Sequence, residues 1–356
     1  MLLLADSFTE RGDSVDLMSM SNALQDYLSI ETTIAFGSGD SRTSNKRVAE
    51  ARSLGLEVVE FSTKKDLEVL AKSKSVTHTY VFSDGKPTSM LYNRSDPGDF
   101  RILDTVHITR VVFRNFHPHG DHYLYVSEWL NKWARKKHGR KIKAMAHPQV
   151  SWLPHIVEPI EGDGDFFRRT VGLPKHSNVI GRIGGSDQFS DPAARAGVFA
   201  LLEKHKDLFF VCANTKPFGS HERLIYTPPL SRASVWDFYA ACSALINGRL
   251  MGESFGFSVA EPLSLGKPVI APNWTRNPLM DRHHVDLLEG TNLLYNSKLD
   301  FVRKVEAALS DPLPKEDLRS RTAVFRASKV AARFADLVLT GYKESNSRES
   351  PRLSMD

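Results

Sequence analysis

The chain has 356 residues, which exceeds the size at which one hydrophobic core usually keeps growing, so two domains are expected. An apolar share of 41%, with 22 glycines and 18 prolines, is ordinary for a globular protein and excludes a low-complexity chain. The formal charge of +5 suits phosphorylated substrates, nucleic acid or an anionic membrane surface, and it does not choose among them.

The cysteine content points to a reducing compartment. Cys212 and Cys242 each lie in an apolar segment without paired spacing, so we expect buried thiols, with neither a disulfide nor a thiolate metal site. The opening MLLLADS is too short for a signal peptide or a membrane span. These features predict a soluble cytoplasmic protein.

The first half of the chain alternates strands with helices, which predicts a parallel sheet covered on both faces. Strands are expected at 2–5, 32–36, 57–61, 76–82 and 106–114, and helices at 13–28, 47–54 and 64–71. Gly12, in the loop Arg11–Ser14, would let the backbone approach a ligand at the carboxyl end of the first strand. A simple helix-capping turn is the alternative for that loop.

A polar stretch follows the strand at 106–114 and contains His117, His119, Asp121 and His122. The histidine spacing allows a metal site on an extended chain. We favour instead a loop at the carboxyl end of a strand, whose side chains hydrogen-bond the hydroxyls of a sugar acceptor. A solvated loop without a role is the third interpretation.

The next segment, 123–137, is predicted to be a helix, and a basic run continues from its end to Lys143. A solvated helix end is the ordinary meaning of such a run, and contact with an anionic lipid or acceptor is the alternative. A strand is expected at 142–146. It would end at His147 and so direct this side chain toward a crevice at the carboxyl edge of the sheet.

The strand–helix pattern starts again after a flexible turn at 161–165. Strands are expected at 179–183, 208–213 and 224–226, and helices at 192–205 and 235–241. Arg182 and Lys216 lie at or just after strand ends, at the edge where an anionic ligand would bind. Structural ion pairing is the alternative for both residues.

The stretch Met251–Ala271 contains two glutamates, Glu253 and Glu261, on either side of a glycine turn that opens a short helix. The first amides of such a helix can hold phosphate oxygens. The two carboxylates would instead accept hydrogen bonds from hydroxyls, which suggests a ligand with sugar hydroxyls on both sides of a diphosphate. A helix that is simply buried against the strand at 268–270 is the alternative.

The rest of the chain is expected to be helical at His283–His284, at 301–309 and, as one long amphipathic helix, at 319–339. The predicted domains are 1–165, completed by the helix at about 319–340, and 166–318. The polar tail at 343–356 is predicted to be disordered.

Two motifs carry a resemblance to a known family. Glu253-Ser254-Phe255-Gly256 with Glu261, followed by Leu265–Ala271, resembles the signature of retaining glycosyltransferases of family 4. Gly181-Arg182-Ile183 is similar to the phosphate-binding strand end of that family. The resemblance implies an α/β fold of two Rossmann-like doubly wound domains facing a central cleft, the type B glycosyltransferase (GT-B) architecture.

The same resemblance implies roles for individual residues. Glu261 would bind the ribose, Glu253 the hydroxyls of the transferred sugar, and Arg182 the leaving diphosphate, while His147 would lie against the donor sugar. The residues that would contact the donor through their backbone or beside its base are Phe255, Gly256, Phe257, Ser258, Pro229 and Leu230.

The sequence departs from the family pattern at two places. Gln188 stands where the family usually has a lysine, and Gly12 stands alone where a glycine pair is common. We expect Lys216 to supply the missing positive charge.

The resemblance implies a glycosyltransferase without metal or other cofactor, which moves a hexose from a nucleotide sugar to a glycan or other hydroxyl acceptor. GDP-mannose is the first expected donor and a UDP-hexose the second. The alternatives are a sugar-nucleotide 2-epimerase and a catalytically weak sugar-nucleotide or glycan-binding module. No nucleic-acid partner is expected; a homodimer and a membrane contact stay open.

Overall fold

The computed structural model describes residues 1–9, 12–86, 102, 105–273 and 281–340. The contacts within the chain divide it into two compact units. The first unit is Met1–Ile156 together with Phe325–Asp356, and the second unit is Val157–Val324. The predicted disordered tail at 343–356 and Arg11 of the first loop lie outside the described residues.

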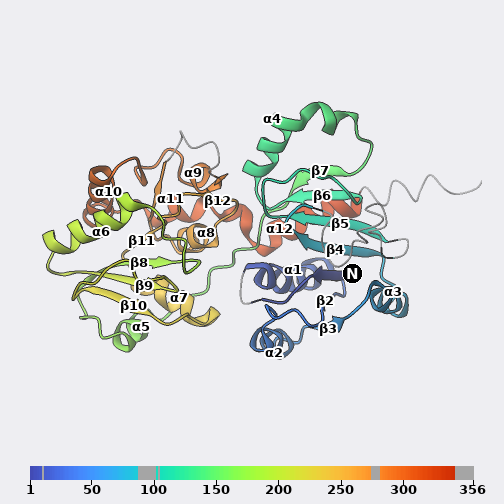
Figure 1. Ribbon diagram of the computed structural model, residues 1–356, viewed down its shortest axis with the longest axis horizontal. Helices are drawn as coiled ribbons and strands as arrows, with labels where there is room; N and C mark the ends of the chain where they lie inside the picture. The colour runs from blue at the N-terminus through green and yellow to red at the C-terminus, as the bar shows by residue number, and fades with distance from the viewer. Residues whose placement is uncertain (10–11, 87–101, 103–104, 274–280, 341–356) are drawn as a thin grey trace, which may run out of the picture. The chain divides into compact units, whose positions relative to one another are not determined.

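The first unit is built on a seven-stranded sheet in the order β3-β2-β1-β4-β5-β6-β7, and all its neighbouring strands are parallel (Figure 1). The strands are β1 Leu2–Ala5, β2 Thr33–Gly37, β3 Val58–Phe61, β4 His78–Ser83, β5 Val106–Val111, β6 His122–Tyr125 and β7 Gln149–Trp152. The helices between them are α1 Gly12–Leu28, α2 Asn45–Ser53, α3 Lys64–Ser73 and α4 Glu128–Ala144.

Strand β1 shows how this sheet is covered on both faces. Its side chains alternate between two hydrophobic clusters, because successive residues of a strand point to opposite faces. Leu3 packs in the cluster that contains residues of α1 and α2. Leu2 and Leu4 pack in the other cluster, together with Leu67 of α3. A strand buried on both faces reads as an uninterrupted apolar run, as LLLA does.

The second unit repeats this design with a six-stranded parallel sheet in the order β10-β9-β8-β11-β13-β15. Its strands are β8 Asn178–Ile183, β9 Leu208–Ala213, β10 Leu224–Thr227, β11 Ala244–Ile246, β13 Val269–Pro272 and β15 Leu294–Tyr295. A separate pair consists of β12 Gly252–Glu253 and β14 Asp281–Arg282. The helices are α5 Gly164–Thr170, α6 Pro192–Lys204, α7 Arg232–Ala241, α8 Phe257–Ser264, α9 His283–Leu288, α10 Lys298–Ser310 and α11 Lys315–Ser320.

Both sheets therefore have the strand order of a dinucleotide-binding fold. In each, the order reverses beside the first strand of the unit, so loops diverge at the carboxyl ends of β1 and β4 in one unit and of β8 and β11 in the other. Open parallel sheets bind ligands outside such a reversal. Each unit is a Rossmann-like domain with one topologically marked edge.

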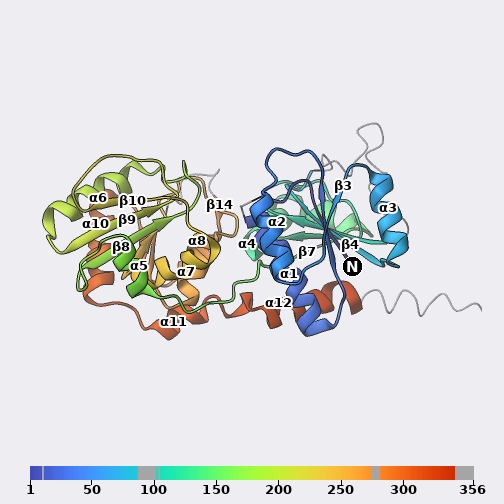
Figure 2. The ribbon, with the colours of Figure 1, turned by 90° about the horizontal axis from the view of Figure 1, so that it is seen from below.

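The prediction of one continuous helix at 319–339 is wrong. The segment contains α11, the 3-10 turn η1 Ala323–Phe325, α12 Ala327–Phe334 and the π-helical turn η2 Ala335–Leu339. The hydroxyl of Thr322 donates to the carbonyl of Arg319 at 3.1 Å, the kind of local bond that competes with a continuous helix. Helix α12 packs beside α1 and joins the core of the first unit (Figures 1 and 2).

Two predictions around α4 are also wrong. Residues 123–125 belong to strand β6, where the Tyr125 hydroxyl donates to the carbonyl of Asn115 at 2.7 Å, and the helix begins only at Glu128. The expected strand at 142–146 does not exist, because α4 continues to Ala144. The strand of this region is β7, which begins after His147 rather than ending before it.

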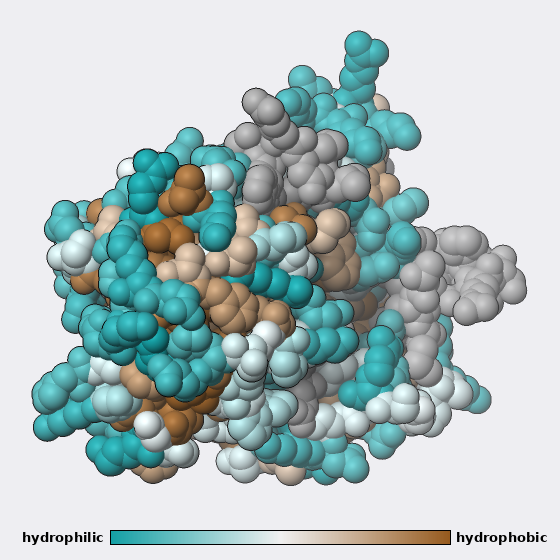
Figure 3. Space-filling model, turned by 60° about the vertical axis from the view of Figure 1, so that its left-hand side comes forward, coloured by the Kyte–Doolittle hydropathy of each residue, from teal (hydrophilic) through white to brown (hydrophobic). Residues whose placement is uncertain are grey.

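Hydrophilic residues cover most of the face seen in Figure 3, and apolar residues form separate patches on it. Large apolar side chains that are exposed include Ile160, Phe166, Met251 and Leu299. Within the described residues, no helix has both the length and the apolar character needed to cross a membrane.

Candidate functional site

The first element of the candidate site is the carboxyl end of β8 in the second unit. Arg182 is 3% exposed, and its guanidinium donates to the Thr215 hydroxyl at 2.5 Å and to the carbonyl of Gly185 at 3.0 Å. Its hydrogen-bond acceptors among the described residues are all neutral, and none of these residues places a carboxylate within ion-pair distance of it. Burial lowers the pKa of Arg182 to about 10, so the group is a buried cation at neutral pH.

The two residues that sequence comparison linked to a missing lysine lie beside this strand end. The side-chain oxygen of Gln188 accepts a hydrogen bond from the Gly185 amide at 3.1 Å, so this side chain folds back on its own loop. Lys216 is exposed, and its backbone amide donates to the carbonyl of Ser186 at 2.7 Å. The backbone of Lys216 thus ties the loop after β9 to the loop after β8, while its side chain extends into solvent.

The loop after β11 brings a second guanidinium to the same edge. Glu253 is 7% exposed; one carboxylate oxygen accepts from the Asn247 amide at 2.8 Å and the other from Arg249 at 2.9 Å. The pKa of Arg182 is lowered mainly by burial, and Glu253 raises it while Arg249 lowers it, so both groups act on Arg182 electrostatically. Sequence reasoning selected Glu253 but missed Arg249 and Asn247.

Helix α8 begins directly beside Glu253. Gly256 precedes the helix with φ of +83°, a left-handed conformation, and no side chain caps the helix start. A Cβ at Gly256 would lie 2.8 Å from Cβ and Cγ of Glu253, so only glycine fits both the dihedral and the contact. The Ser258 hydroxyl accepts from Asn247 at 3.3 Å, which links the helix start to the same cluster.

The two phenylalanines of the predicted donor site have different surroundings. Phe255 is 2% exposed and stacks on His283, with ring centroids 5.2 Å apart and an interplanar angle of 25°. The carbonyl of Phe255 lies 2.6 Å from Nδ1 of that histidine. Phe257 is half-buried at the first position of α8. Phe255 therefore anchors the turn from inside the unit.

Glu261 lies one turn further along α8 and is 2% exposed. The Tyr239 hydroxyl donates to its Oε2 at 2.9 Å, and Arg232 forms an ion pair with Oε1 at 2.5 Å. The N–H directions of Arg232 are not aligned on Oε1, so this buried oxygen has an ionic partner but no hydrogen bond among the described residues. It keeps the capacity to accept a hydrogen bond from a hydroxyl.

Pro229 and Leu230 occupy the turn between β10 and α7. Pro229 is exposed and Leu230 half-buried, and Ser231 caps α7 by accepting from the Ser234 amide. Arg232, the partner of Glu261, follows at once and lies 5.2 Å from the centroid of the Trp236 ring. The predicted base-binding turn and the predicted ribose-binding carboxylate therefore lie together in the second unit.

His147 does not lie where the sequence placed it. The residue is exposed and precedes β7, at the amino end of that strand. In a parallel sheet this is the edge opposite the strand ends that bind ligands. The correction has a physical cause, because the apolar residues before His147 continue helix α4 instead of forming a strand.

The stretch 117–122 is corrected in the same way, because it returns to the amino end of β6. His122 is the first residue of β6 and lies in register with Gln149, the first residue of β7. The Asp121 carboxylate accepts from the backbone amide of His107 at 2.8 Å. Burial lowers the pKa of His122, so its imidazole is neutral at pH 7.

The other two histidines of this stretch do not add to a metal site. His117 is exposed, whereas His119 is 9% exposed and bonds to the carbonyl of His117 through Nδ1 at 2.5 Å. In the chain segments that the structure describes, no three His, Cys, Asp or Glu side chains are grouped so that they could hold a metal ion.

The carboxyl edge of the first sheet instead holds a buried polar cluster that sequence reasoning missed. Gly12 is the half-buried first residue of α1, and Asp16 follows one turn later. Asp16 lies 2.5 Å from Nδ1 of His155 and 3.7 Å from the guanidinium of Arg110, and it accepts from Tyr80 at 3.4 Å.

These four side chains, which we call the Asp16 cluster, are each at most 5% exposed. Burial alone would raise the pKa of Asp16, but His155 and Arg110 hold it below its usual value. The pKa of His155 is lowered by burial, against the opposing effect of Asp16. The cluster therefore contains an ionised Asp16 beside the guanidinium of Arg110. Its members come from α1, β4, β5 and the segment after β7, and no sequence motif joins them.

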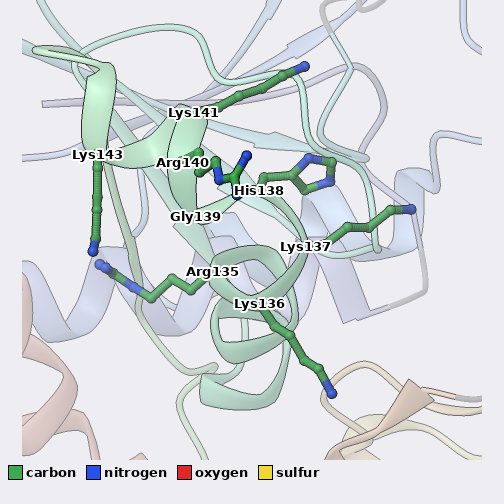
Figure 4. A pocket seen from close by; sticks show the side chains of 8 residues that line it. All are labelled: Arg135, Lys136, Lys137, His138, Gly139, Arg140, Lys141 and Lys143. Carbon is green, nitrogen blue, oxygen red and sulfur yellow. The ribbon is translucent and has the colours of Figure 1, made fainter.

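The basic run of α4 forms an electropositive surface at a kink. The backbone leaves helical geometry at His138, with φ of −124° and ψ of 16°, and the side chains before and after it surround a hollow of about 630 Å³ (Figure 4). The lining residues are Arg135, Lys136, Lys137, His138, Gly139, Arg140, Lys141 and Lys143. Lys132 pairs with Glu128 at 3.3 Å, whereas no carboxylate of the described chain pairs with the six cations of the hollow.

No protein-family model matches this sequence, and no curated protein matches it. Solved structures match nearly the whole chain. A glycosyltransferase from Rickettsia africae has a TM-score of 0.66 at 12% identity, over 96% of this chain and 97% of the other. Anabaena HepE in complex with UDP and glucose has a TM-score of 0.58 at 13% identity, over 98% and 99%. A UDP-N-acetylglucosamine 2-epimerase has a TM-score of 0.63 at 12% identity, over 100% and 98%.

At such identities the likeness concerns the fold. The fold is the GT-B type, with two Rossmann-like domains, and the fold class predicted from the sequence is confirmed. Transferases and an epimerase share this fold, and a fold does not determine an activity. The choice between them depends on the residues of the site.

Proposed function

We propose that this protein is a retaining glycosyltransferase that transfers a hexose from a nucleotide-diphosphate sugar to a hydroxyl of a glycan or other acceptor. The observation that carries the proposal is the strand-end cluster of the second unit. There the buried cation Arg182 has only neutral acceptors, and Glu253 lies beside the uncapped start of α8. The family 4 signature at Glu253–Glu261 supports the same assignment.

The chemistry follows from where charge develops. Breaking the bond between the anomeric carbon and the diphosphate oxygen leaves positive character on the sugar and negative charge on the diphosphate. Arg182 and the first amides of α8 would stabilise that negative charge, and Glu253 would hold the sugar hydroxyls. The acceptor hydroxyl would attack from the face that the diphosphate leaves, and a diphosphate oxygen would take its proton, so configuration is retained.

The nucleoside would lie beside α7. In this proposal Oε1 of Glu261 accepts a ribose hydroxyl, and the turn at Pro229 and Leu230 lies next to the base. The complex of HepE with UDP and glucose favours a UDP-hexose over the GDP-mannose expected from sequence. His147 is not included, because it is exposed at the amino end of β7.

Calorimetric titration with UDP, GDP, UDP-glucose and GDP-mannose, with AMP as the comparison ligand, tests the proposal. Glu253→Gln is expected to lower kcat/KM about 10- to 100-fold, since a hydrogen bond to a charged group contributes about 1.5–3 kcal/mol. Glu261→Gln is expected to weaken binding of the nucleoside diphosphate itself. Glu289→Gln, an exposed change of the same kind in the second unit, is the matched control. Wild-type protein that binds none of these nucleotides would overturn the proposal.

A sugar-nucleotide 2-epimerase is the second candidate, because a UDP-N-acetylglucosamine 2-epimerase covers 100% of this chain with a TM-score of 0.63. An epimerase changes the donor sugar without an acceptor. Incubation with UDP-N-acetylglucosamine alone, followed by chromatography of the released sugar, separates the two activities. Appearance of the 2-epimer without acceptor would favour the epimerase, and transfer only with acceptor would favour the transferase.

A further inference from the structure

The diphosphate site of the proposed function lacks one cation that the sequence pattern calls for, and the structure offers two replacements. Lys216 is exposed, and within the described parts of the chain it is its backbone amide, not its side chain, that bonds to Ser186. Arg249 carries the other available charge, and its side chain is 29% exposed, so it can reach a ligand while belonging to the cluster.

The backbone around Arg249 is fixed against the strand end that carries Arg182. The Ser190 and Asp191 amides both donate to the carbonyl of Gly248, at 3.0 and 2.9 Å. The Leu250 amide donates to the Ser190 hydroxyl at 3.1 Å. These bonds on both sides of Arg249 hold the loop after β11 against the loop after β8.

Arg182 has no carboxylate at contact distance among the described residues, although Glu253 and the exposed Asp187 raise its pKa from further away. Arg182 and Arg249 carry two positive charges, and Glu253 is the carboxylate that bonds to Arg249 at 2.9 Å. Arg182 is almost fully buried with only neutral acceptors. A buried cation without a paired anion is costly unless a ligand compensates its charge. The buried Arg182 therefore points to an anionic ligand at this strand end, where Arg249 is also close enough to act on it.

We propose that Arg249 is the second cation of the diphosphate site, and that it exchanges its bond to Glu253 for the diphosphate when the nucleotide binds. This inference rests on the proposed function. The exchange leaves one oxygen of Glu253 free to accept a sugar hydroxyl while Asn247 keeps the other oxygen in place. Glu253 is thus held by Arg249 only while the site is empty. Arg249, four positions before Glu253, thus supplies the positive charge that the sequence assigned to Lys216.

Calorimetry with UDP, GDP and the nucleosides uridine and guanosine tests the assignment. Arg249→Ala is expected to weaken binding of the nucleoside diphosphate about 10- to 100-fold and to leave nucleoside binding unchanged, because charge-assisted bonds to phosphate are lost. Arg249→Lys should recover part of the affinity. Arg303→Ala, an exposed arginine of α10, is the matched control, and Lys216→Ala tests the competing assignment.

A double-mutant cycle with Glu253→Gln separates direct contact from neutralisation of Glu253. If Arg249 binds the diphosphate, Arg249→Ala weakens binding in both backgrounds. If Arg249 only neutralises Glu253, its removal has no effect in the Glu253→Gln background, and the inference is overturned. Loss of diphosphate binding in Lys216→Ala but not in Arg249→Ala overturns it too. Wild-type protein that binds neither UDP nor GDP overturns the proposed function itself, which is a distinguishable result.

Discussion

The strand-end clusters of the two units show two different ways of burying charge. In the first unit, Asp16 is bonded to His155 and Tyr80 and paired with Arg110, and all four side chains are at most 5% exposed. In the second unit, Arg182 is equally buried but has only neutral acceptors, and the nearby Arg249 is 29% exposed in its side chain.

This difference distinguishes a structural network from a site prepared for a ligand. Removing one partner of a closed network destabilises the fold strongly, because the remaining charge is left buried without its partner. Such a network has few polar groups left to bind a ligand. An open cluster that buries a cation without a paired anion is less stable alone and gains from an anionic ligand. The carboxyl edge of the first sheet thus stabilises its own unit, whereas the carboxyl edge of the second sheet is available to a ligand.

The largest expected effect is on the closed network. Asp16→Asn leaves the buried guanidinium of Arg110 without its carboxylate, so the free energy of unfolding of the first unit should fall by about 3–5 kcal/mol. Urea denaturation followed by circular dichroism measures this. Asp26→Asn, an exposed change on the same helix α1, is the control and should have little effect. Unchanged stability combined with lost nucleotide binding in Asp16→Asn would instead assign Asp16 to a ligand site. The contrast between a structural and a ligand-binding cluster would then be wrong.

The second expected effect is a pH dependence of the free energy of unfolding of the second unit. His284 is fully buried, and burial lowers its pKa from 6.5 to about 4, although its bond to the Pro272 carbonyl raises it. The unfolded chain therefore binds more protons between these two pH values, and stability is complete above pH 6.5 and is lost as the pH falls toward 4. At about 1.36 kcal/mol per pKa unit the loss is roughly 3 kcal/mol.

Unfolding of the second unit measured at several pH values between 4 and 7 tests this. His284→Gln, which cannot titrate, should remove most of the slope, whereas His176→Gln at an exposed position should leave it unchanged. An identical slope in the wild type and in His284→Gln would assign the acid sensitivity to other groups.

The smallest expected effect concerns the support beneath Glu253. Gly256 and Gly290 both have left-handed dihedrals, with φ of +83° and +75°, but a Cβ meets Glu253 only at Gly256 and meets nothing within 4 Å at Gly290. Alanine at Gly256 should therefore cost about 1–3 kcal/mol more than alanine at Gly290, because of overpacking. Thermal unfolding gives the stability difference, and nucleotide binding reports whether Glu253 has moved. Equal costs at both positions would show that the contact with Glu253 relaxes freely.

The sequence predicts most of the fold because the strands of a doubly wound sheet are short apolar runs set apart by helices. Strands β1 and β9 appear at their predicted positions, 2–5 and 208–213. The predictions fail where two apolar segments adjoin. Tyr123 belongs to a strand, and the residues before His147 belong to a helix, because packing against neighbouring elements decides between the two states for such short segments.

The candidate site is predictable only where its residues are neighbours in sequence. Gly256, Glu253 and Glu261 occupy one continuous stretch, so spacing alone identifies them. Arg249 was missed, because its importance depends on its bond to Glu253 and on the hydrogen bonds between the loops after β8 and β11. Neither can be read from the sequence. The Asp16 cluster was missed for the same reason, since Asp16 and His155 lie 139 positions apart.

Helix α12 has a consequence for how the chain folds during its synthesis. Val330 and Phe334 complete the hydrophobic core that begins with Leu17 and Leu24 of α1. The second unit, which ends at Val324, leaves the ribosome before these residues do. The second unit can therefore fold while the face of the first unit that α12 covers is still exposed. Domains usually fold from the N-terminus onward during translation. In this protein the unit that starts first is the one that finishes last.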